Sequence, residues 1–238
     1  MIRTLGAYGS VADEYYNPLL HPTCANFREL SWQFLENLIK AEKYRDLFLD
    51  AQALETGAGK SLVAEFFLSK ELSIQNLSLQ DKSEEMLAHS FRWQNKIEKM
   101  FVSDAREMPI PSNEIQTVFS FLADPYNDEI FWSEVSRVLD LGGLWVLTCP
   151  SHEWASTFRS KETDKLSRFV LADGREVDLT SLTYPTPQFV NSLREKNLVL
   201  ECFQGFSIMD IKSAVSQKLI SNNPLLSSLN GYVFRKIE

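Results

Sequence analysis

Short apolar runs alternate with helical patterns from Leu49 onward, and this alternation constrains the fold more than any other feature of the sequence. The apolar runs typical of buried strands are 51–54, 77–79, 97–102, 117–122 and 144–148. Between them, apolar residues recur at three- and four-residue spacing in 61–68 and 128–139, which indicates helices. Strands that alternate with helices form βαβ units. We therefore predict an α/β fold, in which a mostly parallel sheet carries helices on both faces.

Further elements are predicted on either side of this pattern. Apolar residues at helical spacing predict an amphipathic helix over 24–43, capped by Thr23, after an irregular leader over 8–21 that serves as a lid or only as a tail. The helix over 128–139 is expected to end at Gly142-Gly143. After Pro150, helices are predicted near 188–196 and 210–220, and strands at 198–203 and 231–236.

A hairpin is predicted between these two halves, because the short strands 168–172 and 175–179 flank the turn pair Asp173-Gly174. The whole segment 151–187 is far longer than the usual connection of about 2 to 6 residues. One interpretation is a cap that lays Phe169 over a ligand cleft and excludes water, and the other is a hairpin that only extends the core.

Charge and cysteine usage narrow the class of protein. The 238 residues fit one domain, and their net charge of −8, without a run of Lys and Arg, disfavours a nucleic-acid partner. Cys24, Cys149 and Cys202 show no CxxC pairing, which predicts free thiols rather than disulfides or a zinc site. No apolar run has the length of a signal peptide or a membrane helix, so we expect a cytoplasmic protein without membrane contact.

The most informative segment is 54–61, Leu-Glu-Thr-Gly-Ala-Gly-Lys-Ser, in which a predicted strand ends, glycines follow and a predicted helix begins. Glycines permit a positive φ and remove the Cβ that would keep a ligand away, while a helix N-terminus offers free N–H groups. A tight turn with no ligand is the alternative interpretation.

Asp81 follows the next predicted strand, at about the distance from Glu55 at which Rossmann-type folds place a carboxylate on ribose hydroxyls. Alternatively, Asp81 caps the following helix, a role that Ser83 with Glu84 and Glu85 could also serve. The two roles are compatible with each other.

Four segments, in order along residues 49–150, resemble the motifs of the class I S-adenosylmethionine-dependent methyltransferases. They are 55–59, similar to the glycine-rich first motif; 80–87, similar to the ribose segment; 103–109, similar to the adenine-contacting loop; and 134–139 with Gly142-Gly143, similar to the helix and turn before the fifth strand. The resemblance implies a Rossmann-like, seven-stranded sheet and S-adenosylmethionine as cofactor.

The resemblance also implies roles for single residues. Glu55 and the backbone of 57–59 would hold the methionine end, Asp81 the ribose, and Asp104 the adenine amino group. The complete set expected at the cofactor is Glu55, Thr56, Gly57, Ala58, Gly59, Asp81, Lys82, Met86, Asp104, Ala105, Ser120 and Phe121. Within the single domain 1–238 we then distinguish an N-terminal lid and helix (1–45), a cofactor-binding half (46–150), the hairpin insert (151–187) and the remainder of the sheet (188–238).

Two other functions compete with methyl transfer. Gly59-Lys60-Ser61 invites comparison with the P-loop of NTPases, but that motif needs a Gly where this chain has Leu54. The family itself often has a further Gly in place of Ser61. A non-catalytic binding or assembly module with the same fold is the second competitor, because fold alone does not prove function.

The acceptor side of the site is less defined. Asp124-Pro125-Tyr126 resembles the Asp/Asn-Pro-Pro-Tyr motif of amino-methyltransferases without its second Pro, and it is interpreted as a pocket-edge loop or as a polar turn. His152, Glu153 and His21 are candidate general bases, and none of them is assigned. Trp154 is a candidate pocket residue, whereas Trp93, Trp132 and Trp145 are expected in the core. We expect direct methyl displacement onto a small-molecule acceptor without a metal; the acceptor and the oligomeric state stay open.

Overall fold

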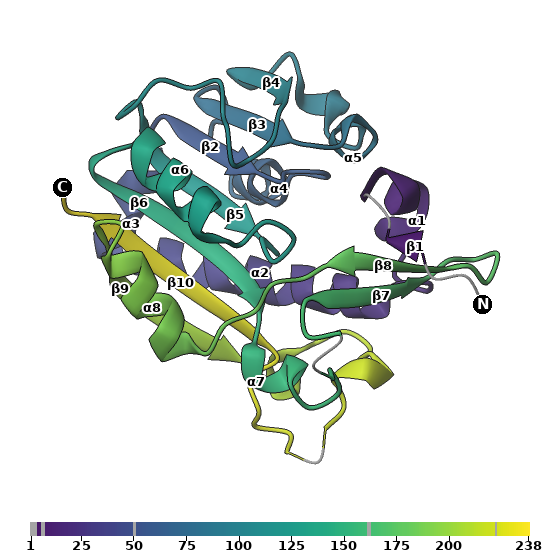
Figure 1. Cartoon of the computed structure of the whole chain (residues 1–238). Helices are drawn as coiled ribbons and strands as arrows, with labels where there is room; N and C mark the ends of the chain where they lie inside the picture. Colours follow the sequence, from purple (N-terminus) through teal and green to yellow (C-terminus); the bar gives the residue numbers. More distant parts are fainter. Residues whose placement is uncertain (1–3, 6–7, 50, 161–162, 222) are drawn as a thin grey trace.

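The computed structural model describes residues 4–5, 8–49, 51–160, 163–221 and 223–238, and a seven-stranded sheet runs through their centre (Figure 1). Its strand order is β4-β3-β2-β5-β6-β10-β9, in which β10 is antiparallel to both neighbours and every other pair is parallel. The strands are β2 (Ala53–Thr56), β3 (Leu77–Asp81), β4 (Lys99–Val102), β5 (Ile115–Phe121), β6 (Leu139–Pro150), β9 (Leu198–Phe206) and β10 (Leu229–Lys236). The predicted α/β fold with a mostly parallel, seven-stranded sheet is confirmed.

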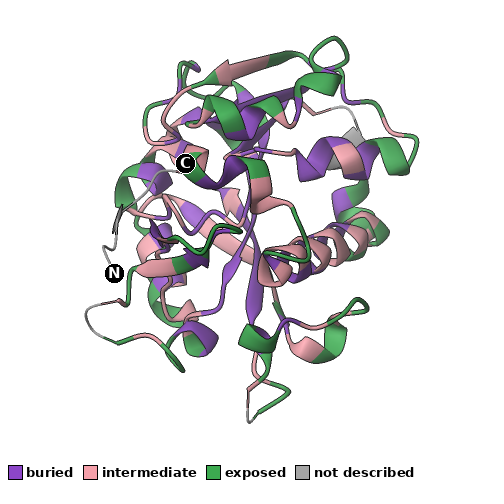
Figure 2. Cartoon of the chain, turned by 90° about the vertical axis from the view of Figure 1, so that its right-hand side faces the viewer, coloured by how far each residue is buried: buried purple, intermediate pink, exposed green. Residues whose placement is uncertain are grey.

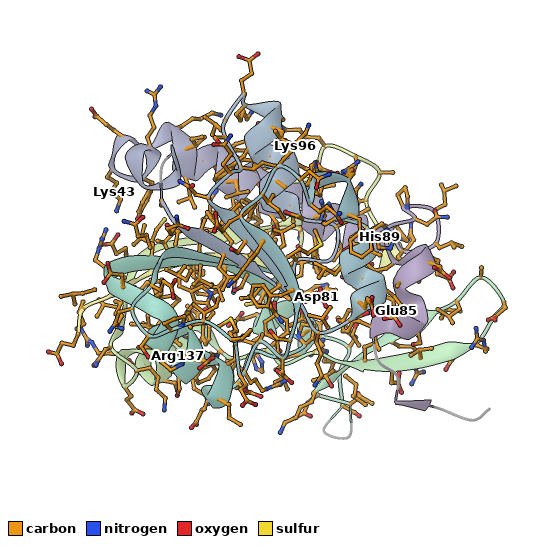
Figure 3. All side chains as sticks on the ribbon, turned by 90° about the horizontal axis from the view of Figure 1, so that it is seen from above. Lys43, Asp81, Glu85, His89, Lys96 and Arg137 are labelled. Atoms are coloured by element: carbon orange, nitrogen blue, oxygen red, sulfur yellow. The ribbon has the colours of Figure 1, made fainter. Side chains whose placement is uncertain are left out.

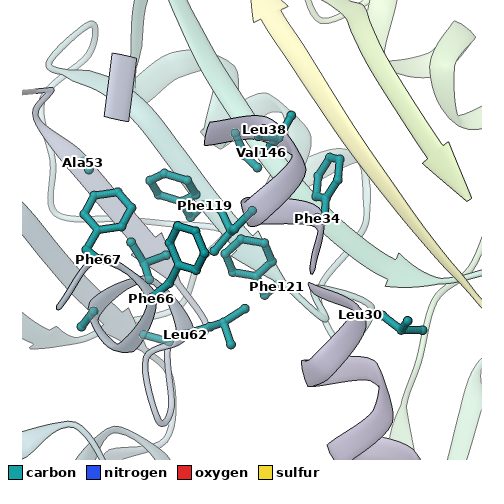
Figure 4. Packing of buried hydrophobic residues seen from close by; sticks show 14 of the residues in the cluster. Leu30, Phe34, Leu38, Ala53, Leu62, Phe66, Phe67, Phe119, Phe121 and Val146 are labelled. Carbon is teal, nitrogen blue, oxygen red and sulfur yellow. The ribbon is translucent and has the colours of Figure 1, made fainter. Parts of the chain in front are cut away.

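Helices cover both faces of this sheet, because the central strands are apolar on both sides. Along β5, Val118 faces one core and Phe119 the other, and Trp145 and Val146 divide in the same way along β6. On the Phe119 side pack α2 (Pro22–Lys40), α4 (Leu62–Ser69) and the residues that Figure 4 labels. On the Val118 side pack α6 (Glu129–Val138) and α8 (Thr186–Arg194). Figure 2 shows the resulting buried strands running through the molecule, with exposed residues at its periphery.

The N-terminal helix begins two residues earlier than the sequence pattern suggested. α2 starts at Pro22, whose fixed φ suits the first helical position, so Thr23 lies inside the helix and is not its cap. Its hydroxyl instead lies 2.7 Å from that of Ser216. The helix ends at Lys40, and a separate helix, α3 (Glu42–Leu49), follows.

The leader is more ordered than predicted. It contains the 3-10 turn η1 (Tyr8–Val11) and the short helix α1 (Ala12–Tyr15), and the two-residue strand β1 (Thr4–Leu5) precedes it. The helix α5 (Glu84–Ala88) packs against β3, η1 and α1, and the 3-10 turn η2 (Phe91–Trp93) follows it. A ring nitrogen of His89 lies 2.9 Å from the carbonyl oxygen of Ala12.

Gly142-Gly143 does not terminate the helix before the fifth predicted strand, which corrects that prediction. α6 ends at Val138, and extended backbone begins at Leu139, the first residue of β6. The register between β5 and β6 shifts between Ile115 and Thr117, so the glycines lie in an irregular stretch of β6, where Gly142 has a φ of +78°.

The predicted helix over 210–220 is wrong. Only two 3-10 turns, η3 (Ile208–Asp210) and η4 (Gln217–Leu219), occur there. Polar groups of the segment bond to α2 instead: the Lys212 amide donates to Glu29 at 2.6 Å, and the Ser216 amide donates to the Asn26 side chain at 2.8 Å. These tertiary hydrogen bonds compete with those that a helix would make.

The predicted hairpin is confirmed, and it belongs to a small second sheet. β7 (Leu166–Val170) and β8 (Glu176–Thr180) are antiparallel around Gly174, whose φ is +81°, and β1 pairs with β8. The hairpin projects away from the main sheet beside the leader, after the short helix α7 (His152–Ala155) (Figure 1). Its buried residues form a separate apolar cluster with the leader: Val11, Phe169, Leu171, Val177 and Leu179, with Tyr8, Tyr15 and Cys24 against them.

Two further predictions concern absences within the described part of the chain. No described helix has the length and apolarity that a bilayer-spanning helix needs. Cys24, Cys149 and Cys202 are free thiols, as expected.

Candidate functional site

A cavity of about 1090 Å³ opens at the carboxyl ends of β2, β3, β4 and β5. Ligands of open α/β sheets bind at this edge, and the volume slightly exceeds the usual 300–1,000 Å³ of small-molecule sites. The leader and α2 form the opposite wall. Of the residues predicted at the cofactor, those that line the cavity are Glu55, Gly57, Ala58, Asp81, Lys82, Met86, Asp104, Ala105 and Phe121.

Thr56 and Ser120 lie beneath this cavity and not in its lining, which corrects the expectation that Ser120 lines it. Both residues are fully buried, and their hydroxyl oxygens lie 2.8 Å apart. The indole of Trp145 donates to Ser120 at 3.0 Å. These hydrogen bonds join the carboxyl ends of β2 and β5 to the middle of β6.

Glu55 is directed toward α4, where it caps the helix from the end of β2. Its carboxylate accepts hydrogen bonds from the Ser61 hydroxyl and, at 3.0 Å, from the Leu62 backbone amide. Only 2% of the side chain is exposed, and this burial raises the pKa of Glu55 to about 7, although the hydrogen bond from Ser61 acts in the opposite direction. Glu55 therefore fixes the angle between β2 and α4 and also borders the cavity.

The glycine turn between β2 and α4 allows side chains from other segments to approach the backbone closely. Gly57 and Gly59 have φ values of +58° and +43°. A Cβ on Gly57 would lie 2.1 Å from the Tyr126 hydroxyl, and a Cβ on Gly59 would lie 2.2 Å from the Tyr16 hydroxyl. Only glycine fits at either position, because the turn needs both the positive φ and the missing side chain.

The backbone N–H groups of this turn are not free, contrary to the expectation for a helix N-terminus. Each of the five finds an acceptor within the chain, at 2.7–3.2 Å. The pairs are Gly57 with the Gln80 side chain, Ala58 with the Gln80 carbonyl, Gly59 with Asp81, Lys60 with the Tyr16 hydroxyl, and Ser61 with the Ser90 hydroxyl. The turn can therefore offer a ligand close van der Waals contact but few hydrogen-bond donors.

Asp81 ends β3, and in the view of Figure 3 the side chains of Glu85 and His89 lie between it and the outer edge of the molecule, on the side of the leader. Its two oxygens accept from the backbone amides of Gly59 and Ser83, both at 2.9 Å, and each keeps lone-pair capacity for another donor. Burial raises the pKa of Asp81. The alternative role as a helix cap falls to Ser83, whose hydroxyl accepts from the Met86 amide at the start of α5.

Asp104 follows β4 and is held from two sides. Lys82 donates to it at 2.7 Å, and the backbone amide of Arg106 donates at 2.9 Å. Although partial burial acts in the opposite direction, the Lys82 hydrogen bond leaves the pKa of Asp104 below its usual value. Lys82 and Asp104 thus form an ion pair on the cavity wall.

A second cavity, of about 210 Å³, adjoins the first. Four residues line both: Tyr8, Tyr15, Cys24 and Leu122. The loop after β5 divides between them, because Asp124 lines the smaller cavity, whereas Pro125 and Tyr126 line the larger one. Asp124-Pro125-Tyr126 is therefore a pocket-edge loop, as interpreted.

Only one of the three candidate general bases lines a cavity. His21 lines the second cavity, whereas His152 and Glu153 line neither cavity. The Nε2 of His152 lies 3.2 Å from the Ser156 hydroxyl, and Glu153 accepts from Ser151 at 3.1 Å. Both residues therefore make local contacts on α7.

The tryptophans are placed largely as expected. Trp93, Trp132 and Trp145 are buried in the two main cores. Trp154 is also buried, but it borders the second cavity, so it remains a candidate pocket residue.

Several site residues were missed at the sequence level. The leader supplies Tyr8, Tyr15 and Tyr16 to the cavity walls, and Arg159 and Lys218 line the second cavity. The tyrosine-rich composition of the leader was the only available signal. Arg159 comes from a segment with no periodic pattern, and Lys218 comes from the stretch 210–220 that was predicted to be a helix. Only the fold brings them to one place.

The strand order, the two helical layers and the cavity above the glycine turn define the class I methyltransferase fold. No protein-family model matches the chain, and no curated protein sequence matches it significantly. Among solved structures, an S-adenosylmethionine-dependent methyltransferase from Clostridium acetobutylicum is similar, with a TM-score of 0.66 and 16% identity over 98% of this chain and 100% of that one.

Two further solved structures share the fold over nearly their whole length. DhpI in its complex with SAM and HEP has a TM-score of 0.63 and 17% identity over 96% of this chain and 94% of that one. A chain of the complex between the Haloferax volcanii Trm112 methyltransferase activator and a methyltransferase has a TM-score of 0.67 and 11% identity over 99% and 100%. At these identities the likeness concerns the fold.

Proposed function

We propose that this protein is an S-adenosylmethionine-dependent methyltransferase that acts on a small-molecule acceptor. The observation that carries the proposal is the meeting of the glycine turn, Asp81 and Asp104 in one cavity, from the ends of three different strands. Open α/β sheets hold ligands at such an edge, and the class with this fold uses S-adenosylmethionine there. Three of the motifs of the resemblance, 55–59, 80–87 and 103–109, contribute residues to this cavity.

The residues of the cavity fit this cofactor. Gly57 and Ala58 of the glycine turn line the cavity, Asp81 keeps lone pairs for ribose hydroxyls, and the buried Met86 offers an apolar face to the adenine ring. Asp104, with the Ala105 backbone, lies on the wall where the adenine amino group would need an acceptor. When bound, the cofactor supplies an electrophilic methyl group on a sulfonium.

The contribution of the protein itself to methyl transfer is then mainly to position the two reactants. The walls of the two adjoining cavities orient the acceptor toward the cofactor and exclude water, which can supply much of the rate enhancement of a displacement. The second cavity, about 210 Å³ in volume, supports a compact acceptor.

A nucleoside triphosphatase is disfavoured by the turn itself. A P-loop cradles phosphates with free backbone N–H groups, and here those of 57–61 are bonded within the chain. The Ser61 hydroxyl donates to Glu55, and the Lys60 ammonium pairs with Glu65 at 3.3 Å. Neither side chain is placed to hold a metal-bound phosphate.

Calorimetry tests the proposal. We expect one-to-one binding of S-adenosylhomocysteine and no comparable binding of Mg-ATP. Asp81→Asn keeps the side-chain shape but removes the charge, and should weaken S-adenosylhomocysteine by roughly ten- to a hundredfold, since hydrogen bonds to charged groups contribute about 1.5–3 kcal/mol. Glu84→Gln makes the same charge change on an exposed residue outside the cavity and should leave affinity within twofold.

Two results would count against the proposal. Tight Mg-ATP binding without any response to S-adenosylhomocysteine would overturn the cofactor assignment. Tight cofactor binding without transfer of a labelled methyl group to any member of a broad acceptor panel would favour the non-catalytic module.

A further inference from the structure

The second cavity is built from segments that are far apart in the sequence. The segments that line it include the start of α2, the loop after β5, the region around α7 and η4. The four lining residues that it shares with the larger cavity place it directly beside the proposed cofactor site. A methyl acceptor has to occupy such an adjoining space, because the reacting atoms must come within about 3–3.5 Å.

Two cationic side chains gather at this cavity around one aromatic ring. The guanidinium carbon of Arg159 lies 6.0 Å from the centre of the Phe158 ring, and the ammonium of Lys218 lies 5.3 Å from it. Both cations line the cavity. Lys218 forms no ion pair with any residue that the structure describes, so its charge is available to a ligand.

Arg159 is held by three hydrogen bonds, but one of its nitrogen donors has no partner in the described part of the chain. Its Nη1 donates to the carbonyls of Asp164 and Ser181, both at 2.9 Å, and its Nη2 donates to the Ser181 hydroxyl at 2.8 Å. Its Nε is buried and has no hydrogen-bond partner among the described residues, and the same is true of the Nε2 of His21. Buried polar atoms without partners are uncommon in folded proteins, so these two indicate a group that the chain does not supply.

Among the described residues that line the cavity, three carry a cationic side chain and one, Asp124, carries a carboxylate. Asp124 is 7% exposed and faces Arg159 and Lys218, and burial raises its pKa to about 6, which leaves it ionised at neutral pH. Burial lowers the pKa of His21, so that ring is neutral there. The second arginine at the cavity, Arg168, pairs with Asp178 at 3.0 Å and Glu176 at 3.3 Å. One carboxylate therefore faces two cations, on a chain whose net charge is −8.

We propose that the second cavity is an anion-binding subsite, in which Arg159 and Lys218 hold a carboxylate or phosphate group of the methyl acceptor. Anionic oxygens of a ligand suit the hydrogen-bond donors of both side chains. Phe27, Trp154 and Phe169 on the cavity wall fit an apolar or aromatic body next to the anionic group. The assignment of this anion to the acceptor rests on the proposed methyl transfer.

Binding of small probes to the full chain, with and without saturating S-adenosylhomocysteine, tests the subsite. The probes are benzoate and phenyl phosphate, with benzamide as a neutral ligand of matched shape, and affinity is measured by ligand-observed NMR titration. We expect benzoate, phenyl phosphate or both to bind at least tenfold more tightly than benzamide. The stronger of the two anions identifies the group that the subsite prefers.

Single substitutions then test whether the probe binds in the second cavity. Lys218→Gln should weaken the anion roughly tenfold, which corresponds to about 1.4 kcal/mol, whereas Lys218→Arg should stay within threefold of the parent. Lys165→Gln removes an exposed positive charge outside both cavities and should change nothing. Arg159→Gln should weaken anion binding as well. Because Arg159 also holds neighbouring backbone carbonyls, this variant could fail to fold, and in that case Lys218→Gln decides whether the subsite exists.

The outcomes separate this inference from the proposed function. Equal affinity for benzoate and benzamide, no binding of either anion, or anion binding unchanged by Lys218→Gln would overturn the subsite even where S-adenosylhomocysteine binds. Anion binding that depends on Lys218 in a protein that ignores S-adenosylhomocysteine would support the subsite and overturn the methyltransferase assignment.

Discussion

The hydroxyl oxygen of Tyr16 accepts a hydrogen bond from the backbone N–H of Lys60 at 2.7 Å, so a leader side chain completes the glycine turn. The same hydroxyl lies where a Cβ on Gly59 would project, and the ring makes an edge contact with His89 at a centroid distance of 4.9 Å. The leader is thereby fixed to the turn that the proposed cofactor would touch. This relationship leads to the first prediction.

Tyr16→Phe should loosen the glycine turn without unfolding the protein. The Lys60 amide would lose its acceptor, and one such hydrogen bond contributes about 0.5–1.5 kcal/mol. We expect faster hydrogen exchange at Lys60 and weaker binding of S-adenosylhomocysteine. Tyr184→Phe, at a ring that packs on Trp132 on the other side of the sheet, is the control and should alter neither. Unchanged exchange at Lys60 in Tyr16→Phe would contradict the prediction.

Gly57→Ala should destabilise the protein more than Gly174→Ala. Both glycines have positive φ, so both alanines are strained, but a Cβ on Gly57 would also lie 2.1 Å from the Tyr126 hydroxyl, whereas one on Gly174 meets nothing within 4 Å. Strain alone costs roughly 1–2 kcal/mol, and the displacement of Tyr126 adds to it. Denaturant unfolding of the two variants measures the difference. Equal losses of unfolding free energy would contradict the prediction, because they would show that Tyr126 moves aside without an energetic cost.

The stability of the protein should fall as the pH rises from about 4.5 to 7, and Glu55 should contribute to this slope. Burial raises the pKa of Glu55 to about 7, so in this window the folded state holds a proton that the unfolded state has released. The contribution is on the order of 3 kcal/mol between the two ends. Glu55→Gln should flatten the dependence of unfolding free energy on pH, measured by urea titration.

The slope should not vanish in Glu55→Gln, because burial also raises the pKa values of Asp81 and Asp124. Glu84→Gln, at an exposed carboxylate, is the matched control and should reproduce the parent slope. A parent whose stability rises between pH 4.5 and 7 would contradict the assignment of the sign.

Phe169→Ala should release the leader while the main sheet stays folded. Phe169 belongs to the small apolar cluster of the hairpin and leader, which is separate from the two cores on the faces of the main sheet. Removal of a buried Phe costs about 3–5 kcal/mol at well-packed sites, and here the loss should appear as local opening. Hydrogen exchange should rise in residues 8–16 but not in β2 or β5, and Val170→Ala, on the exposed side of the hairpin, is the control.

Replacing residues 168–179 by a short Gly-Ser link asks whether the hairpin is a cap. The cap hypothesis predicts near-normal folding and cofactor binding with methyl transfer lost. If melting temperature, cofactor affinity and transfer all collapse together, the hairpin has a structural role instead.

The elements that could be predicted from the sequence are those whose buried residues form a local apolar pattern. The runs around Leu54, Leu79 and Val118 are apolar because central strands of this sheet are covered on both faces, so the strands, and hence the edge that carries Asp81, could be located. Strand limits were less accurate: β2 runs Ala53–Thr56 where 51–54 was predicted. Glu55 was located correctly, but its cap on α4 depends on the side-chain direction, which no sequence pattern specifies.

What could not be predicted depends on contacts between distant segments. The failure of 210–220 to form a helix follows from hydrogen bonds to Glu29 and Asn26, which lie more than 180 residues away in the chain. The position of Ser120 near the end of β5 suggested that it lines the cavity. Its hydroxyl instead forms hydrogen bonds with Thr56 and Trp145, and the residue is not part of the lining. The second cavity depends in the same way on the convergence of His21, Asp124, Arg159 and Lys218.

The wall common to the two cavities would link the proposed cofactor and acceptor energetically. Tyr8, Tyr15, Cys24 and Leu122 border both spaces, so a molecule in either space would contact the same four side chains. If binding of one ligand orders these side chains, the second ligand no longer has to order them. By thermodynamic reciprocity, each ligand would then strengthen the binding of the other by the same factor, even though no atom of one has to touch the other.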